Sequence, residues 1–268
     1  MKPYLIDYHV HSRWCGHATG EVHEYVEAAI ARGLSEIGLS EHLPVPIPTK
    51  VKINLTEAEL EHWVAEVLRA RDEYRRDIVV RLGSECDFIP GHEHCIERIL
   101  SRYPFDYVIG SVHFLGQWGF DSPDQIDEYG RRDIFEAYRE YFAMAVRAVR
   151  SGFFDLFGHA DLIKKFGIRP QQACSEMHQE LALALSESDM CFEVNTAGMD
   201  KPVQEIYPSN DLLLELARRG VPVTLGSDAH APGEVGRYFD LAVAQLRQAG
   251  FTRLVLFENR RRATRPLP

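Results

Sequence analysis

The sequence predicts an α/β fold in a single domain spanning residues 1–268, with parallel strands that form a closed or nearly closed barrel. The first observation is a repeated order of short β-rich run, polar or glycine-containing turn and amphipathic stretch. The second is that no linker-like or low-complexity stretch interrupts this series. The third is that histidine, aspartate and glutamate recur where the β-rich runs end, and such ends meet at one face of a barrel.

Seven β-rich runs are predicted to be strands, in the order 4–11, 35–42, 78–87, 106–113, 154–161, 191–197 and 221–230. Helix candidates between them include 21–33, 56–76, 92–103, 132–152 and 209–220. Several of these end at glycine, which readily adopts the left-handed conformation of a helix C-cap. Residues 251–261 are a candidate eighth element, and we interpret their basic end as a solvated tail.

Composition narrows the class of protein. The sequence has no apolar run of about 18 residues and no cleavable leader, so we expect a cytoplasmic protein without membrane contact. The five cysteines are odd in number and form no C-x-x-C pair, which argues against a disulfide framework or a zinc ribbon. A formal charge of −10 argues against a nucleic-acid partner, because binding a phosphate backbone requires basic surface. Nothing in the sequence indicates an oligomeric state.

The first predicted strand carries a dense group of metal-ligand residue types. Alternate residues of a strand face the same way, so Asp7, His9 and His11 share one face, and His17 follows across a turn. Cys15 lies inside this group, but we expect it not to be a thiolate ligand because the histidines already supply enough donors.

Ligand-type residues end six of the seven predicted strands. The set comprises His9, His11, His42, Glu85, His113, His159, Asp228 and His230, and His17 joins it from the turn after the first strand. The sixth strand ends instead in Asn195 and Thr196. Imidazole and carboxylate suit zinc, manganese or iron, and about nine ligands are too many for one ion. We therefore expect two to three divalent metal ions.

The remaining five histidines serve as an internal comparison, because none ends a predicted strand; they are His23, His62, His92, His94 and His178. His92 and His94 form a second H-x-H pair, but at the start of a predicted helix, where residues two apart point in different directions. We expect all five to be exposed or capping histidines.

The ordered motifs D-Y-H-V-H-S, C-G-H, S-E-H, G-S-E, G-S-V-H, G-H-A-D, E-V-N-T-A-G and G-S-D-A-H resemble the polymerase and histidinol-phosphatase (PHP) family. The resemblance runs to about Phe239, and the stretches SVHFLGQWGFD and NTAGMDKPVQEIYPS are similar to its phosphatase branch. It implies a distorted (β/α)7 TIM-like barrel. It also implies a trinuclear site in which Glu85 bridges two ions, the first bound by His9, His11 and Asp228 and the second by His113 and His159. The third ion is then bound by His17, His42 and His230.

The resemblance further implies a phosphoric monoester hydrolase that converts L-histidinol phosphate to L-histidinol in histidine biosynthesis. Our hypothesis is in-line attack on phosphorus by a metal-bridging hydroxide, with Asp228 or His230 relaying a proton to the leaving group. Asp7, Glu41 and Asp161 are expected to orient imidazoles, although Asp161 is also a candidate helix cap. The alternatives are a PHP-type phosphoesterase or nuclease acting on nucleotides or DNA ends, and a metal-binding protein without catalytic activity.

The substrate is expected to be a small phosphorylated molecule, and the loops after the strands supply candidate contacts. Basic residues that follow the fifth and sixth strands are candidates to bind the phosphate: Lys164, Lys165, Arg169 and Lys201. Acidic and amide residues are candidates to bind an amine and an imidazole on the leaving group: Asp121, Asn195 and Glu205. For each residue the alternative is an ordinary structural role, as a solvated charge, a turn residue or a cap.

Overall fold

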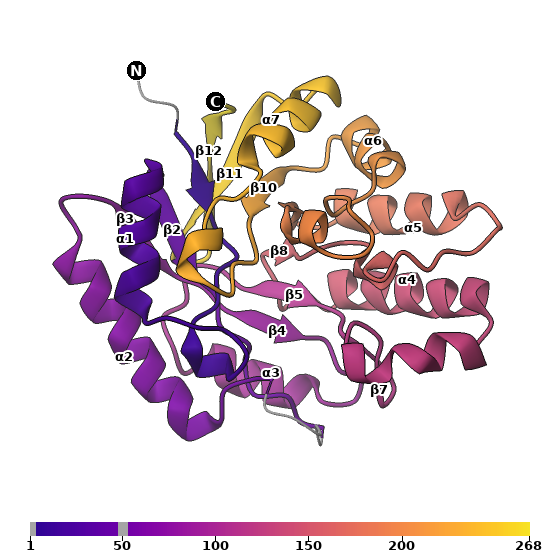
Figure 1. The fold of residues 1–268 in the computed structure, drawn as a ribbon, viewed down its shortest axis with the longest axis horizontal. Helices are drawn as coiled ribbons and strands as arrows, with labels where there is room; N and C mark the ends of the chain where they lie inside the picture. Colours follow the sequence, from indigo (N-terminus) through magenta and orange to yellow (C-terminus); the bar gives the residue numbers. More distant parts are fainter. Residues whose placement is uncertain (1–3, 48–52) are drawn as a thin grey trace.

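The structure is a computed structural model that describes residues 4–47 and 53–268. Parallel strands in two sheets form its centre, with α1 and α2 on one side and α4 and α5 on the other (Figure 1). The three-stranded sheet has the order β1-β2-β3, at Ile6–Asp7, Glu36–Leu39 and Val79–Leu82. The five-stranded sheet has the order β10-β9-β8-β5-β4, at Val223–Gly226, Cys191–Asn195, Leu156–Phe157, Ile109–Ser111 and Glu85–Asp87.

The two sheets are linked by single bridges rather than by continuous ladders. At one junction His42 pairs in parallel with Glu85, and at the other Val10 pairs in parallel with Ala229. The predicted α/β class is confirmed. The predicted closed or nearly closed barrel is not confirmed, because the parallel strands of the described residues form two separate sheets joined at these bridges.

The third predicted strand, 78–87, divides into β3 and β4, which belong to different sheets. The break falls at Gly83 and Ser84, where the ring of Tyr107 occupies the space that a side chain on residue 83 would need. The chain therefore passes from one sheet to the other inside what the sequence presents as one β-rich run.

Five helices lie within or close to the predicted ranges: α1 (Val22–Arg32), α2 (Glu57–Glu73), α3 (Glu93–Leu100), α4 (Ile134–Arg150) and α6 (Asn210–Arg218). Two more, α5 (Ser175–Ser186) and α7 (Phe239–Gln248), were not among the helix candidates. Short 3-10 helices occupy Arg13–Cys15, Pro123–Arg131, Leu162–Lys164, Ala197–Asp200 and Pro232–Glu234. Among the described residues, no helix is both long enough and apolar enough to cross a membrane.

Two hairpins complete the fold. The first, β6 (Phe114–Leu115) with β7 (Trp118–Gly119), follows β5. The second, β11 (Arg253–Glu258) with β12 (Arg261–Pro266), is longer than the expected eighth element. Residues of β11 are mostly buried and those of β12 are all exposed, so the basic end is a solvated edge strand rather than a loose tail.

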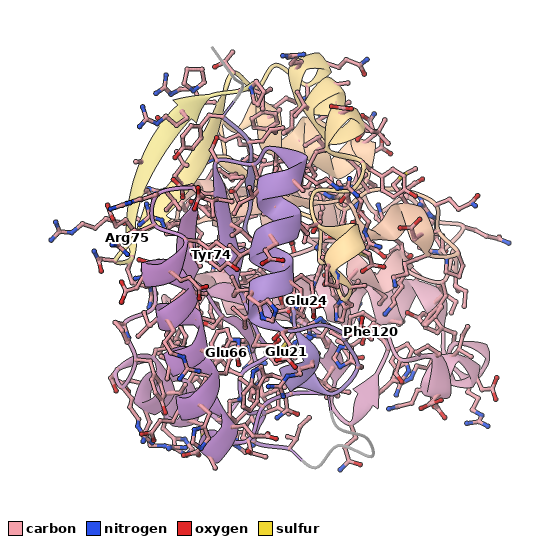
Figure 2. All side chains as sticks on the ribbon, turned by 60° about the vertical axis from the view of Figure 1, so that its left-hand side comes forward. Glu21, Glu24, Glu66, Tyr74, Arg75 and Phe120 are labelled. Carbon is pink, nitrogen blue, oxygen red and sulfur yellow. The ribbon has the colours of Figure 1, made fainter. Side chains whose placement is uncertain are left out.

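The loop after β1 is tied to α1 and α2 by polar contacts. The Arg13 side chain pairs with Glu21 at 2.5 Å, and Glu21 in turn forms a capping box with Glu24 at the start of α1. Trp14 Nε1 donates a hydrogen bond to Glu66 on α2 at 2.7 Å. Figure 2 shows Glu21, Glu24 and Glu66 at these positions. These contacts fix the loop that carries Cys15 and His17.

One hydrophobic cluster runs from Ile6 to Phe257 and includes residues of both sheets. Tyr107 lies at its centre, with its ring stacked on Tyr8 at 4.8 Å and its hydroxyl donating to the Tyr8 carbonyl at 2.6 Å. Gly38 and Gly83 leave room for this ring because neither has a Cβ atom. The ring thus fills the space between the two sheets.

Gly38→Ala should destabilise the fold because the added Cβ would lie 2.7 Å from Tyr107 Cζ in a region that cannot expand. We expect a loss of about 1–3 kcal/mol in the free energy of unfolding, measured by urea denaturation. The control is Gly130→Ala, where nothing lies within 4 Å of the new Cβ. Equal stability of the two variants would contradict this account of the core.

Candidate metal centre

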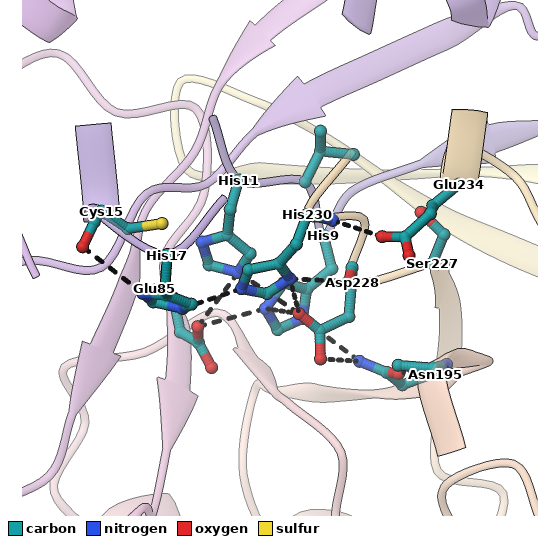
Figure 3. Close-up of polar contacts among 12 residues, drawn as sticks. His9, His11, Cys15, His17, Glu85, Asn195, Ser227, Asp228, His230 and Glu234 are labelled. Carbon is teal, nitrogen blue, oxygen red and sulfur yellow. Dashed lines mark hydrogen bonds and ion pairs between the residues drawn. The ribbon is translucent and has the colours of Figure 1, made fainter. Parts of the chain in front are cut away.

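The structure brings all nine predicted ligand residues together at the carboxyl ends of the parallel strands. Each belongs to at least one group of three whose donor atoms lie within 4.8 Å of one another. The residues come from segments as far apart as the β1 end and the loop after β10. Figure 3 shows His9, His11, His17, Glu85, Asp228 and His230 facing a common centre.

Glu85 lies at the middle of this cluster and is 2% exposed. Its Oε2 atom lies 3.0–3.4 Å from ring nitrogens of His42, His9 and His11. Its Oε1 atom lies 2.9 Å from His159 Nε2 and 3.5 Å from His113 Nε2. Burial alone would raise the pKa of Glu85, but the surrounding imidazoles hold it well below its usual range. The two oxygens of one carboxylate therefore face two different sets of histidines.

The first set of donors has the spacing that a bound cation requires. Asp228 Oδ1 lies 3.4 Å from His11 Nε2 and 3.8 Å from His9 Nε2, and both nitrogens also face Glu85 Oε2. His9 Nε2, His11 Nε2 and Glu85 Oε2 are buried and have no hydrogen-bond partner. Ligands at about 2.1 Å from a tetrahedral ion are about 3.4 Å apart. These orphaned atoms fit a divalent metal.

A second group of imidazoles lies nearer the solvent. His17 Nε2 is 3.0 Å from His230 Nε2, and the His11 ring stacks on those of His42 and His230 at 4.3 and 4.5 Å. Burial, followed by the neighbouring imidazoles, lowers the pKa of His17 to about 4 and that of His230 well below its usual range. Both rings are therefore neutral at pH 7 and offer lone pairs.

Cys15 belongs to a group with His17 and His230, but its environment keeps the thiol protonated. The side chain is buried, and burial raises the pKa of the thiol to about 12. Its sulfur donates to the Ser12 carbonyl at 3.3 Å.

The carboxylates that were expected to orient imidazoles make other contacts; they are Asp7, Glu41 and Asp161. Asp7 accepts hydrogen bonds from the backbone amides of Ser227 and Gly236 and so ties β1 to the loop after β10. Glu41 Oε2 is 3.9 Å from His11 Nδ1, beyond hydrogen-bond distance. Asp161 precedes the 3-10 helix Leu162–Lys164 but its side chain makes no capping hydrogen bond there, and it accepts instead from the Ser209 amide at 2.8 Å.

Two other carboxylates orient the ligand-type histidines, and the sequence reasoning missed both. Glu193 Oε1 lies 2.7 Å from His9 Nδ1, and Asp87 Oδ1 lies 2.9 Å from His113 Nδ1. Each comes two residues from a residue already singled out, Asn195 or Glu85, on the same strand. Strand alternation, which places such pairs on one face, was the signal that would have found them.

Two of the nine residues have left-handed backbone conformations that non-glycine residues rarely adopt. His159 has φ of 23° and Asp228 has φ of 50°. Such conformations cost on the order of 1–3 kcal/mol each and persist only where the surroundings impose them. At His159 the amide is held by Glu193 Oε2 at 2.9 Å.

A pocket of about 950 Å³ opens over the histidine cluster, and seven of the nine residues line it. Three of the candidate substrate contacts also line it: Asp121, Lys165 and Lys201. Lys165 Nζ lies 3.0 Å from Asp121 Oδ2. Burial alone would raise the pKa of Asp121, but Lys165 and His113 lower it to about 2. This wall of the pocket therefore presents an ionised carboxylate that is paired with Lys165.

The other four candidates do not line the pocket. Lys164 is 2% exposed and is held by Asp161 and Glu205, each at 3.1 Å, and by the Ile206 carbonyl. Arg169 pairs with the same Glu205 at 2.6 Å. Asn195 is buried beneath the cluster, where its amide donates to Glu193 at 3.1 Å. Lys164, Arg169, Asn195 and Glu205 thus make structural contacts, and their contact with a substrate stays a prediction.

None of the five comparison histidines joins a ligand group within the described residues. The reason given for His92 and His94 needs correction, however. His92 precedes α3 rather than lying in it, and the two rings are 6.4 Å apart and close to parallel.

Imidazoles and carboxylates from the strand ends are grouped around one shared glutamate beneath a pocket. This arrangement is typical of metal-dependent hydrolases. The profile of the PHP domain matches residues 7–197, and the chain belongs to this family. The resemblance seen in the motifs is thereby confirmed.

The three similar proteins described next are all named as histidinol-phosphatases. A protein of Deinococcus radiodurans named "Probable histidinol-phosphatase" is 43% identical over 96% of this chain and 98% of its own length. The histidinol-phosphatase of Bacillus subtilis is 29% identical over 87% of this chain and 96% of its own. The crystal structure of histidinol phosphate phosphatase from Lactococcus lactis, complexed with zinc, L-histidinol and phosphate, matches with a TM-score of 0.84 at 26% identity. That match covers 98% of this chain and 99% of the other.

Lys164→Met should destabilise the protein because it leaves Asp161 without its cation partner in the interior. We expect the free energy of unfolding to fall by about 3–5 kcal/mol, measured by urea denaturation. Lys201→Met is the control, since Lys201 is only partly buried and lines the open pocket. If Lys164→Met were as stable as Lys201→Met, the structural role of Lys164 would be wrong.

Proposed function

We propose that this protein is a metal-dependent phosphatase that hydrolyses L-histidinol phosphate to L-histidinol and phosphate. The observation that carries the proposal is the Glu85 carboxylate, whose two oxygens face separate sets of imidazoles below an open pocket. Relatives that match nearly the whole chain are named histidinol-phosphatases, and one was crystallised with both products of this reaction. We also propose that residues 1–268 act as one barrel-like domain, which the continuous core supports.

The metal content is part of the proposal. His9, His11 and Asp228 would hold one ion with Glu85, and His113 and His159 would hold a second with the other Glu85 oxygen. The outer imidazoles of His17, His42 and His230 would hold a third. Imidazole and carboxylate ligands suit zinc, iron or manganese, and zinc is the ion in the Lactococcus structure.

Charge explains how an acidic chain would attract a phosphate. Three divalent ions against two ligating carboxylates leave a local excess of about +4. When bound, such ions activate a water nucleophile and neutralise phosphate oxygens. Lys165 and Lys201 on the pocket wall would bind the oxygens that remain, because they are the candidate cations that line the pocket.

The other end of the substrate is an amine and an imidazole, which require acidic or polar partners. Asp121 lines the pocket and keeps its negative charge at pH 7 because its pKa is about 2. We therefore assign binding of the substrate amine to the pocket wall that carries Asp121. Proton transfer to the leaving oxygen is assigned to Asp228 or His230, which line the pocket next to Glu85.

A phosphoesterase or nuclease acting on nucleotides or DNA ends is the second candidate. The PHP family membership favours it in part, but the formal charge of −10 gives a nucleic-acid backbone little to bind outside the pocket. The third candidate, a protein that binds metal without catalysis, would show no turnover.

Glu85→Ala should empty two metal sites together, because each oxygen of the carboxylate serves a different set of histidines. We expect the metal content of the purified protein, measured by elemental analysis, to fall by about two equivalents and activity to be lost. His94→Ala is the control and should keep the metal content of the wild type. Retention of full metal content by Glu85→Ala would exclude a bridging role.

The substrate proposal predicts strong discrimination. Histidinol phosphate should exceed glycerol phosphate and p-nitrophenyl phosphate in kcat/KM by roughly 10⁴-fold, since a site built to bind an amine leaves its partners unpaired with the analogues. Phosphate release is measured under the same metal conditions, with a nucleoside monophosphate and a phosphodiester in the panel. Equal efficiency on all substrates would exclude a site built for histidinol phosphate, and preference for the diester would favour the nuclease.

A further inference from the structure

Glu193 is a buried carboxylate that contacts three parts of the candidate metal centre without facing the pocket. It lies on β9 and is 1% exposed. Its Oε1 atom is 2.7 Å from His9 Nδ1. Its Oε2 atom accepts hydrogen bonds from the His159 backbone amide at 2.9 Å and from Asn195 Nδ2 at 3.1 Å.

The first contact selects a tautomer of His9. A carboxylate can only accept, so a neutral His9 must carry its proton on Nδ1. The lone pair is then on Nε2, the atom that faces Glu85 and Asp228 and has no hydrogen-bond partner. The opposite tautomer would place a hydrogen at the point where a metal ligand is needed.

The second oxygen holds two further ligand positions in place. The amide that it binds belongs to His159, whose φ of 23° needs an outside constraint. Asn195, held by the same oxygen, reaches Asp228 Oδ2 at 3.5 Å (Figure 3). The Glu193 carboxylate thus holds the His9 ring and the His159 backbone, and through the Asn195 side chain it also holds the Asp228 carboxylate.

The surrounding backbone is shaped to admit this carboxylate. Gly226 on β10 pairs with Asn195 in parallel register, and a Cβ at residue 226 would collide with Glu193 and with His9. A Cβ at Gly158, by contrast, would lie 3.5 Å from Glu193, an ordinary van der Waals contact. The space is therefore specific to glycine at residue 226.

We propose that Glu193 is a positioning residue that selects the metal-binding tautomer of His9 and sets its distance from His159 and Asp228. It thereby controls metal affinity without touching the metal or the substrate. The inference rests on the proposed metal ligands but not on the identity of the substrate, so a metal-binding test separates its failure from failure of the proposed reaction.

Glu193→Gln is the test, because it keeps the shape and replaces one acceptor oxygen by a donor. The amide can no longer accept from both His9 and the His159 amide. We expect affinity for Mn²⁺, measured by competition with a chelator, to fall about 10–100-fold at the tightest site. Added Mn²⁺ should restore kcat toward the wild-type value while KM for the phosphate ester stays unchanged.

Glu36→Gln is the matched control, since Glu36 is also buried but contacts Tyr4, Tyr8 and Arg81 and none of the nine ligand-type residues. It should alter thermal stability and leave Mn²⁺ affinity unchanged. Glu193→Asp provides a second route should Glu193→Gln not fold, because the shorter side chain withdraws the carboxylate from His9 Nδ1 and from the His159 amide. Wild-type Mn²⁺ affinity in the folded Glu193→Gln or Glu193→Asp protein, or an equal loss in Glu36→Gln, would overturn the proposal.

Discussion

The contact between the Glu85 carboxylate and five imidazoles is the interaction around which the carboxyl end of the fold is arranged. His9, His11, His42, His113 and His159 all approach Glu85 within 3.5 Å. They come from the ends of four strands, His9 and His11 from β1 and the others from β2, β5 and β8. Glu85 starts the strand at the junction between the two sheets. The division of the third β-rich run therefore has a consequence for the site, because it places this carboxylate where histidines from both sheets can reach it.

The electrostatic field differs between the two layers of the cluster. Burial alone would lower the pKa of both inner rings, but Glu193 and Glu85 raise the pKa of His9 well above its usual range. At His11, Asp228 and Glu85 outweigh burial and raise the pKa to about 9. At the outer layer, burial and neighbouring imidazoles lower the pKa of His17 and His230. Without metal, these shifts favour the protonated form of His9 and His11 and the neutral form of His17 and His230. Metal binding at His9 and His11 would therefore displace protons, whereas His17 and His230 offer free lone pairs.

The strand-end rule found the ligand-type residues because strand position is visible in the sequence as β-rich runs followed by turns. It could not separate Lys164 from Lys165. These neighbours lie at the end of a 3-10 turn, where one points into the interior and the other to the pocket. The strand-end rule also missed Glu193, because this residue lies two positions before the end of β9. The gaps between the two sheets were not predicted, because β-rich runs do not reveal where a ladder breaks.

The buried ion pairs of Lys164 help to shape the pocket wall. Lys164 joins the segment after β8 to Glu205, and the Lys165 carbonyl accepts from the Val203 amide at 3.1 Å. These contacts connect the loop that carries Lys165 to the loop that carries Lys201. The two cations proposed for the phosphate are thus held by contacts made by their neighbours. A rigid wall of this kind binds at a lower entropic cost than two lysines on independent loops.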